Sequence, residues 1–153
     1  MDPRVTDWLF KSPELAHIEE LDFSAAFTVA QSVLTITNPE KYAIPDGYFY
    51  TLLGVSGYIE EPGMAVANFV NILWNINRNA KRGVFGNDQV MSRLLDINGS
   101  KPPIWYPYGA FRFMPGEQLQ VKFAQRTSTT WNGGTKRVGV VLTLLGLHHS
   151  LVA

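Results

Sequence analysis

Cysteine is absent from this 153-residue chain, and charged residues are scarce at 17%. Without cysteine the chain forms no disulfide, no thiol nucleophile and no zinc–thiolate site. The charge fraction lies below the roughly 25% of ordinary soluble domains, which favours a protein whose surface is partly covered by other subunits. A hydrophobic fraction of 46% excludes intrinsic disorder, and no apolar run is long enough for a transmembrane helix.

Net charge is lacking as well, because 13 basic side chains balance 13 acidic ones. The chain has no overall field to attract nucleic acid or an anionic membrane, so we expect no direct nucleic-acid partner. Residues 1–61 nevertheless carry a net charge of −7 and residues 62–153 a net charge of +7. Either the fold interleaves these halves and the charges mix, or the subunit has an acidic and a basic edge suited to head-to-tail contacts.

Motifs of catalysis are missing too. No glycine-rich phosphate loop occurs, and the stretch GVSGY at 54–58 lacks the second glycine of a nucleophile elbow. Its small residues indicate a bend or bulge in a strand. His148 and His149 point to opposite faces of a strand without an acidic or thiolate partner nearby, which argues against a metal site. We therefore expect no enzyme, no cofactor and no metal.

The first 22 residues predict an N-terminal arm. Ser12, Pro13 and Glu14 have the character of a helix start, with a serine cap, a proline in the first turn and an acid at the positive end of the dipole. The segment WLF at 8–10 precedes them as a hydrophobic anchor without a local packing partner. The arm docks either on its own domain or on a neighbouring subunit.

Residues 23–153 have the pattern of strand segments and turn residues that is typical of an all-β domain. Short apolar or alternating segments are separated by glycine, proline, asparagine and aspartate, which is typical of an antiparallel sandwich. We predict an antiparallel β-sandwich of jelly-roll type that follows the short helical arm. The expected strands are 27–37, 48–59, 67–77, 90–97, 104–113, 118–126 and 137–147.

The last expected strand is apolar on both faces. Val138, Val140, Leu142 and Leu144 share one face, and Val141 and Leu145 stand on the other. A strand of this kind is covered on both sides, here by the N-terminal arm or by another chain. The candidate residues for a contact between subunits are Trp8, Phe10, Val141 and Leu145.

Aromatic residues gather in two places after residue 100. Three lie among the prolines of segment 102–108, and one lies in the polar loop at 127–136. They pack the end of the sandwich or a subunit contact, or they form a flat surface on which a sugar ring stacks. The candidate residues for a ligand or partner surface are Trp105, Tyr106, Tyr108 and Trp131.

Two proline–glycine turns lead into strands, in the runs IPDGYFYTLLGVSG at 44–57 and FMPGEQLQV at 113–121. With the closing segment 138–146, which ends in glycine, these runs resemble small β-sandwich or jelly-roll structural proteins of bacteriophage virions. The likeness covers most of residues 25–147 as a pattern of strands and turns.

This resemblance implies a minor capsid, vertex, collar or spike-base protein that assembles in rings and has no catalytic residues. We therefore expect a non-enzymatic structural subunit of a viral particle. Its partners would be other copies of itself and other virion proteins, and it would be made in a host cytoplasm. The alternative is a carbohydrate-binding or receptor-binding module that uses exposed aromatic residues.

Overall fold

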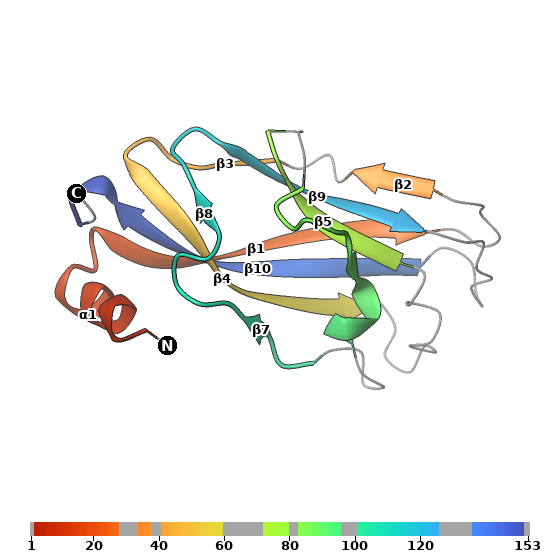
Figure 1. The fold of residues 1–153 in the computed structure, drawn as a ribbon, viewed down its shortest axis with the longest axis horizontal. Coiled ribbons are helices and arrows are strands. Elements are labelled where there is room, and N and C mark those ends of the chain that lie inside the picture. Colours follow the sequence, from red (N-terminus) through yellow and green to blue (C-terminus); the bar gives the residue numbers. More distant parts are fainter. Residues whose placement is uncertain are drawn as a thin grey trace.

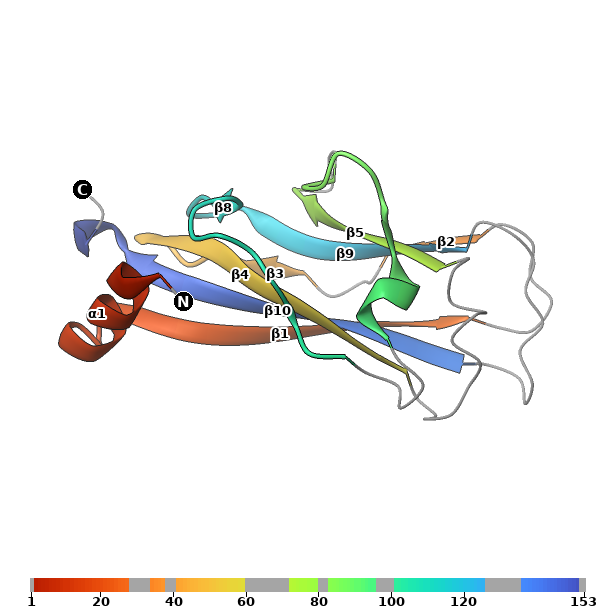
Figure 2. The ribbon, with the colours of Figure 1, turned by 60° about the horizontal axis from the view of Figure 1, so that its bottom comes forward.

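The computed structural model describes residues 2–27, 34–37, 41–59, 72–79, 83–95, 101–125 and 136–151. It shows two antiparallel sheets packed face to face, with one helix outside them, which confirms the expected all-β sandwich (Figures 1 and 2). Sheet I contains β1, β4, β7, β8 and β10, and sheet II contains β2, β3, β5, β6 and β9. The elements are α1 (Pro3–Lys11), β1 (Ala16–Phe27), β2 (Leu34–Thr37), β3 (Tyr42–Ala43), β4 (Tyr48–Ile59), β5 (Ile72–Arg78), β6 (Gln89–Val90), η2 (Met91–Leu94), β7 (Ile104–Trp105), β8 (Arg112–Phe113), β9 (Gln118–Gln125), β10 (Lys136–His148) and η3 (His149–Leu151).

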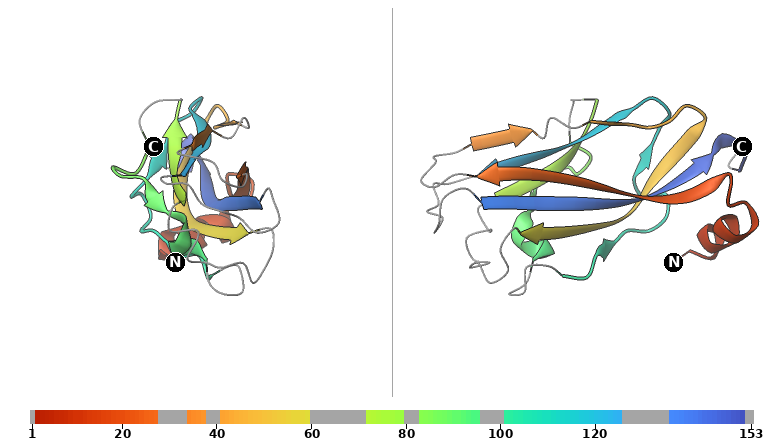
Figure 3. Two further views of the ribbon diagram at one scale, coloured as in Figure 1. Left: turned by 90° about the vertical axis from the view of Figure 1, so that its right-hand side faces the viewer. Right: turned by 180° about the vertical axis from the view of Figure 1, so that it is seen from behind.

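The strand order is that of a jelly roll. β2 and β3 both pair with β9, and β7 and β8 both pair with β4, so each of these two pairs occupies one strand position. If β2 with β3 is counted as position 2 and β7 with β8 as position 6, the chain has eight strand positions in sequence order. These positions are arranged 1-8-3-6 across sheet I and 2-7-4-5 across sheet II. The first position pairs with the last, the second with the seventh, and so inward, as in an antiparallel ribbon rolled into a sandwich. β1 consequently lies beside β10 over its whole length (Figure 3).

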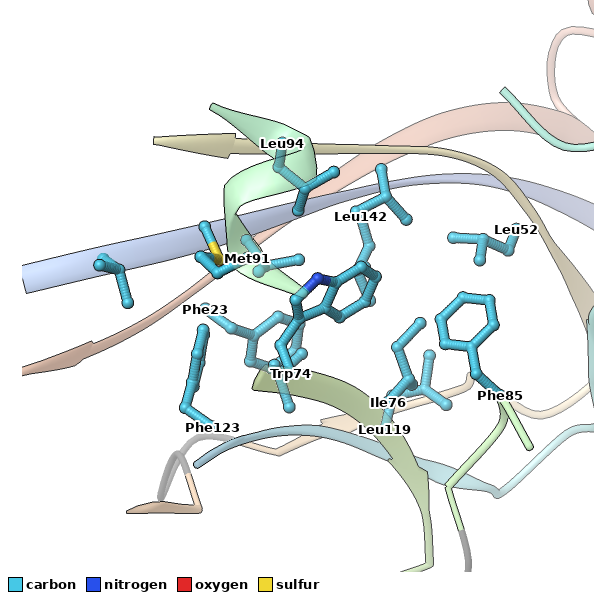
Figure 4. Packing of buried hydrophobic residues seen from close by; sticks show 14 of the residues in the cluster. Phe23, Leu52, Trp74, Ile76, Phe85, Met91, Leu94, Leu119, Phe123 and Leu142 are labelled. Atoms are coloured by element: carbon cyan, nitrogen blue, oxygen red, sulfur yellow. The ribbon is translucent and has the colours of Figure 1, made fainter. Parts of the chain in front are cut away.

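The inner cluster, between the two sheets, is formed by alternate residues of the strands. On β10 the residues Val138, Val140, Leu142 and Leu144 are buried there, as the alternation in the sequence predicts. Trp74 of β5 lies in the middle of the cluster, with Met91 and Leu94 of η2 on one side (Figure 4). Other members shown there are Phe23, Leu52, Ile76, Phe85, Leu119 and Phe123.

The N-terminal helix lies earlier in the chain than predicted. It spans Pro3–Lys11, whereas Ser12, the predicted first residue, is its C-terminal cap. Pro13 follows the helix, where its ring and missing N–H prevent continuation. Residues after it enter β1, which begins at Ala16 and continues across the expected boundary between residues 22 and 23.

Two expected strands also differ from the structure. Among the described residues of the segment 90–97, only Val90 belongs to a strand, because Met91–Leu94 forms the 3-10 helix η2. The segment 104–113 holds two short strands, β7 and β8, separated by a loop. Parts of the expected strands at 28–33, 67–71, 96–97 and 126 lie outside the described residues.

The small residues in β4 are explained by two separate features of the structure. The register against β10 shifts between Thr143 and Leu144, which leaves Leu53 as an extra residue on β4 and confirms the expected bulge. A Cβ atom on Gly57 would lie 2.6 Å from Cβ of Leu94, so glycine at this position lets η2 approach the strand. β4 therefore carries close neighbours on both faces.

The acidic and basic halves of the sequence are interleaved. Sheet I combines β1 and β4 from the acidic half with β10 from the basic half, and sheet II likewise draws on both. The charges mix, as in the first of the two alternatives. Within the described part of the chain, no helix is long and apolar enough to cross a membrane.

Candidate functional site

Helix α1 is set up by its first residues. Oδ1 of Asp2 accepts a hydrogen bond from the backbone N–H of Arg4 at 2.9 Å, and Pro3 follows in the first turn, where it lacks only an N–H that the helix does not use. The hydrogen bonds and charge of Arg4 hold the pKa of the Asp2 carboxyl below its ordinary value. Asp7 and Lys11 form an ion pair one turn apart on the exposed side.

The helix covers one end of the outer face of sheet I. We call the apolar group beneath it the outer cluster, and its buried members are Val5, Ala16, Leu53, Leu145 and Leu147. Side chains of Trp8 and Leu9 from the helix, of Tyr108 and of Leu151 pack against these residues. α1 and η3 lie at the same end of the sandwich (Figure 3). The arm thus docks on its own domain.

This docking corrects the expectation for Leu145. The side chain is 0% exposed because the chain's own helix covers it, so it presents no surface to a second copy. Val141 stands on the same face of β10, four residues before Leu145, and is half-buried outside this cluster. Beside it, Tyr58 donates a hydrogen bond to Oδ1 of Asp22 at 2.8 Å.

Trp105 lies against the bulged part of β4. It pairs with Gly54, and a Cβ atom on that glycine would lie 2.6 Å from Cε3 of the indole, so only glycine leaves room for the ring. The side chain remains 61% exposed. Gly54 itself pairs with Thr143, which pairs with Glu20. Trp105 therefore ends a cross-strand row that carries a hydroxyl and a carboxylate on the outer face of sheet I.

The two tyrosines after Trp105 turn in different directions. Tyr106 packs against Phe85 and Phe111 beside the inner cluster, and this burial raises the pKa of its phenol. Tyr108 packs on the indole of Trp8 at a centroid distance of 5.4 Å, and the guanidinium of Arg4 lies 5.0 Å from its ring centroid.

A pocket of about 630 Å³ opens between the start of α1 and this aromatic segment. Its lining consists of Asp2, Val5, Leu53, Trp105, Tyr106, Pro107 and Tyr108. The walls are mainly apolar, and the Asp2 carboxylate is occupied by Arg4 at 2.9 Å. The volume is that of an ordinary small-ligand site.

The structure joins the two sets of residues that the sequence singled out separately. Trp8 and Leu145, from the predicted subunit contact, meet Tyr108, from the predicted ligand surface, in the outer cluster. Phe10 lies on the last turn of α1 with 82% of its surface exposed. Trp131 lies outside the described residues. The pocket, which depends on the β4 bulge and the helix start together, was not predicted.

All three histidines of the sequence gather around Tyr48. Its ring centroid lies 5.5 Å from that of His17 and 5.3 Å from that of His148, whose ring stacks on His149 at 4.2 Å. Nε2 of His17 lies 2.8 Å from the hydroxyl of Tyr50. In the part of the chain that the structure describes, no group of three His, Asp or Glu residues has the arrangement of a metal site.

A polar network accompanies these histidines between the sheets. Tyr42 of β3 donates a hydrogen bond to Glu19 of β1, and its hydroxyl lies 3.2 Å from that of Tyr50 on β4. Burial raises the pKa of Tyr50 and of Tyr42 above the ordinary value of a phenol. The network joins sheet II to sheet I, and the spacing of its residues in the sequence gave no sign of it.

Comparisons with known proteins give likenesses of fold. No family model matches the sequence, and no curated protein matches it. Among solved structures, the cyanophage Pam1 capsid asymmetric unit is similar at a TM-score of 0.45 and 15% identity, over 86% of both chains. A structure of infectious bursal disease virus, Gx strain, is similar at 0.36 and 10%, and this chain covers 32% of that chain. The periplasmic g-type lysozyme inhibitor PliG of Aeromonas hydrophila gives 0.30 and 14%, over 84% of this chain and 87% of that one.

Structural neighbours thus include viral capsid proteins with a β-rich fold. At these identities and TM-scores the similarity describes the fold alone.

Proposed function

We propose that this chain is a non-enzymatic structural subunit of a bacteriophage virion that assembles with copies of itself into rings. The observation that carries the proposal is the placement of exposed apolar side chains. Four of the five large ones among the described residues, Phe10, Ile18, Ile104 and Trp105, lie on α1 or on strands of sheet I. Exposed apolar side chains on one sheet and on the helix beside it offer surface that other protein can cover.

The fold and the composition support the same proposal. Jelly rolls are the domains of many viral capsids, and this strand order encloses a complete inner cluster without help from a partner. The subunit therefore has its own hydrophobic core before it assembles. Its low charge fraction of 17% suits a surface that neighbouring subunits cover in part. Assignment to a virion is an analogy at the level of the fold, and the exposed apolar surface is its independent support.

A carbohydrate-binding module is the second candidate, and Trp105 is the observation that favours it. The indole is 61% exposed, is backed by Gly54, and shares a cross-strand row with Thr143 and Glu20. A flat ring beside a hydroxyl and a carboxylate is a surface on which a pyranose stacks and forms hydrogen bonds.

Light scattering separates the two functions. For a structural subunit we expect the wild-type protein to form discrete assemblies of several chains as its concentration rises from micromolar to millimolar, and negative-stain images should show rings. A glycan-binding module should instead stay at the 17.1 kDa mass of one chain and be retained on immobilised β-glucan or chitin oligosaccharides, with retention lost in Trp105→Ala. A single-chain protein at every concentration would overturn the proposed structural role.

A further inference from the structure

Phe10 is the most exposed large apolar side chain that the structure describes, at 82%. It occupies the last turn of α1, whose buried face is centred on Val5. At about 100° per residue, Phe10 points roughly 140° away from Val5, so its phenyl cannot join the outer cluster without rotating the whole helix. An aromatic ring that is so fully exposed to water is typical of a hot-spot residue whose binding partner is absent.

The pocket at the other end of the same helix has the complementary chemistry. Its walls come from Val5, Leu53 and the aromatic segment 105–108, and it holds about 630 Å³. The Asp2 carboxylate in its lining already accepts hydrogen bonds from the backbone and side chain of Arg4. An apolar group satisfies such a pocket better than a ligand that needs a free ionic partner.

We propose that the phenyl of Phe10 from one copy of this chain occupies the pocket of a second copy. The inference rests on the proposed structural function and names the contact by which copies join. Phe10 lies about 7.5 Å along the helix axis from Val5 and points away from the sheet, so it cannot enter the pocket of its own chain. Each copy has one phenyl and one pocket on different parts of its surface, which makes the contact heterologous and adds copies head to tail.

The exposed area of the two side chains supports a second copy as the occupant. Phe10 of one copy and Trp105 of the other, at 82% and 61% exposure, together offer on the order of 300 Å² of the roughly 1,600 Å² that a specific contact buries over both partners. Exposed residues of α1 and of the loop at 106–110 lie next to them in the sequence and add to this area.

Two variants and a matched control test the contact. Phe10→Ser removes the phenyl but keeps the pocket, and Pro107→Arg places a long charged side chain at the exposed rim of the pocket but keeps the phenyl. Met114→Ser is the control, because Met114 is another exposed apolar residue, at 48%, in the turn between β8 and β9. Far-UV circular dichroism of each variant should match the wild type, since all three positions are on the surface.

Light scattering should give wild-type assembly for Met114→Ser and at least tenfold weaker assembly for Phe10→Ser and for Pro107→Arg. Mixing these two variants in equal amounts should then produce a species of two chains, because the phenyl of one enters the open pocket of the other. If Phe10→Ser assembles like the wild type, the proposed contact is wrong and the structural function stands. If the wild type never assembles, the structural function and the contact are both wrong.

Discussion

The molecule has two apolar clusters that are built in different ways. The inner cluster is enclosed by ten strands of two sheets, and its members come from nearly every part of the sequence. The outer cluster lies between sheet I and a single nine-residue helix. Both meet on β10, where Leu142 points into one and Leu145 into the other, and both leucines are fully buried.

Because the two clusters are enclosed differently, we expect the inner cluster to determine global stability and the outer cluster to determine only the local stability of α1. Most side chains of the inner cluster lie on strands that pair with segments far apart in sequence, so they cannot be exposed without opening a sheet. The cover of the outer cluster is one short helix, and an isolated helix of nine residues is not stable in water. We therefore expect α1 to open in a local step while the sandwich remains folded.

The largest effect should come from the inner cluster at Trp74. Trp74→Ala should lower the free energy of unfolding by about 3–5 kcal/mol, because it leaves a cavity between the sheets. Guanidinium unfolding followed by far-UV circular dichroism measures the change. Trp74→Phe is the control: it keeps a ring and removes an indole N–H that has no partner among the described residues, so it should cost much less. An unchanged unfolding midpoint for the alanine variant would contradict this account of the inner cluster.

A matched pair on β10 tests the comparison directly. Leu142→Ala and Leu145→Ala remove the same side chain from opposite faces of one strand. Each should lower the free energy of unfolding by about 2–4 kcal/mol. In hydrogen exchange, the variant at 142 should speed exchange throughout both sheets. The variant at 145 should speed exchange mainly at the amides of α1. Equal patterns for the two variants would show that the clusters are one cooperative unit.

A smaller effect is expected where η2 meets β4. Gly57→Ala should lower the free energy of unfolding by about 1–3 kcal/mol, because the new methyl group would overlap Leu94 and Met91 at the edge of the inner cluster. Gly86→Ala is the control, since no atom lies within 4 Å of its added methyl group. Thermal unfolding of both variants provides the measurement. A loss that is equal for both would point to backbone flexibility as the cause.

The smallest effect concerns Tyr58, on the part of the outer face that α1 leaves uncovered. Burial, together with the hydrogen bond to Asp22, raises the pKa of Tyr58 to about 12. A raised phenol pKa stabilises the fold fully below about pH 10, and this contribution is lost as the pH rises from about 10 to 12, because the unfolded chain ionises first. The difference in stability between the wild type and Tyr58→Phe should therefore shrink across this range. A difference that is constant with pH would contradict the assignment.

Sequence reasoning succeeded where the structural cause is local or strictly periodic. The range predicted for β4, 48–59, is the observed strand, β9 begins at residue 118 as predicted, and β10 is one residue longer at each end than predicted. The turns before β4 and β9 were predicted from proline followed by glycine, and Gly47 and Gly116 indeed have φ near +80°. These features depend on backbone preferences that single residues carry.

Prediction from sequence failed where two segments carry similar local signals for the same element. Asp2–Pro3 is as good a helix start as Ser12–Pro13, and the pairing of β1 with β10 decides between them. At 91–95 the apolar residues Met91, Leu94 and Leu95 have the spacing of a helix, which the strand prediction overlooked. Pairing across the whole chain is not visible in a local window.

The candidate site was only half predictable for the same reason. The apolar outer face at Leu145 required a cover, but nothing in the sequence chose between the arm and another chain. Alternation along β5 places Asn75 on the face opposite to Trp74 and Ile76, yet it is buried because Phe85 and Asp88 of the following loop bind its amide. The pocket beside α1 could not be predicted, since a strand bulge, a helix start and a loop form it jointly.

The central place of β10 in sheet I has a consequence for the order in which the protein is made. β1 and β4 lie on either side of it, and Ala16 must wait for Leu147 before it can form its backbone pairing. While the ribosome is still adding the residues before 136, both earlier strands carry unpaired edges toward the gap that β10 will fill. Sheet I therefore closes only after nearly all of this sequence has left the exit tunnel, and folding is slow compared with that of a chain with neighbouring contacts.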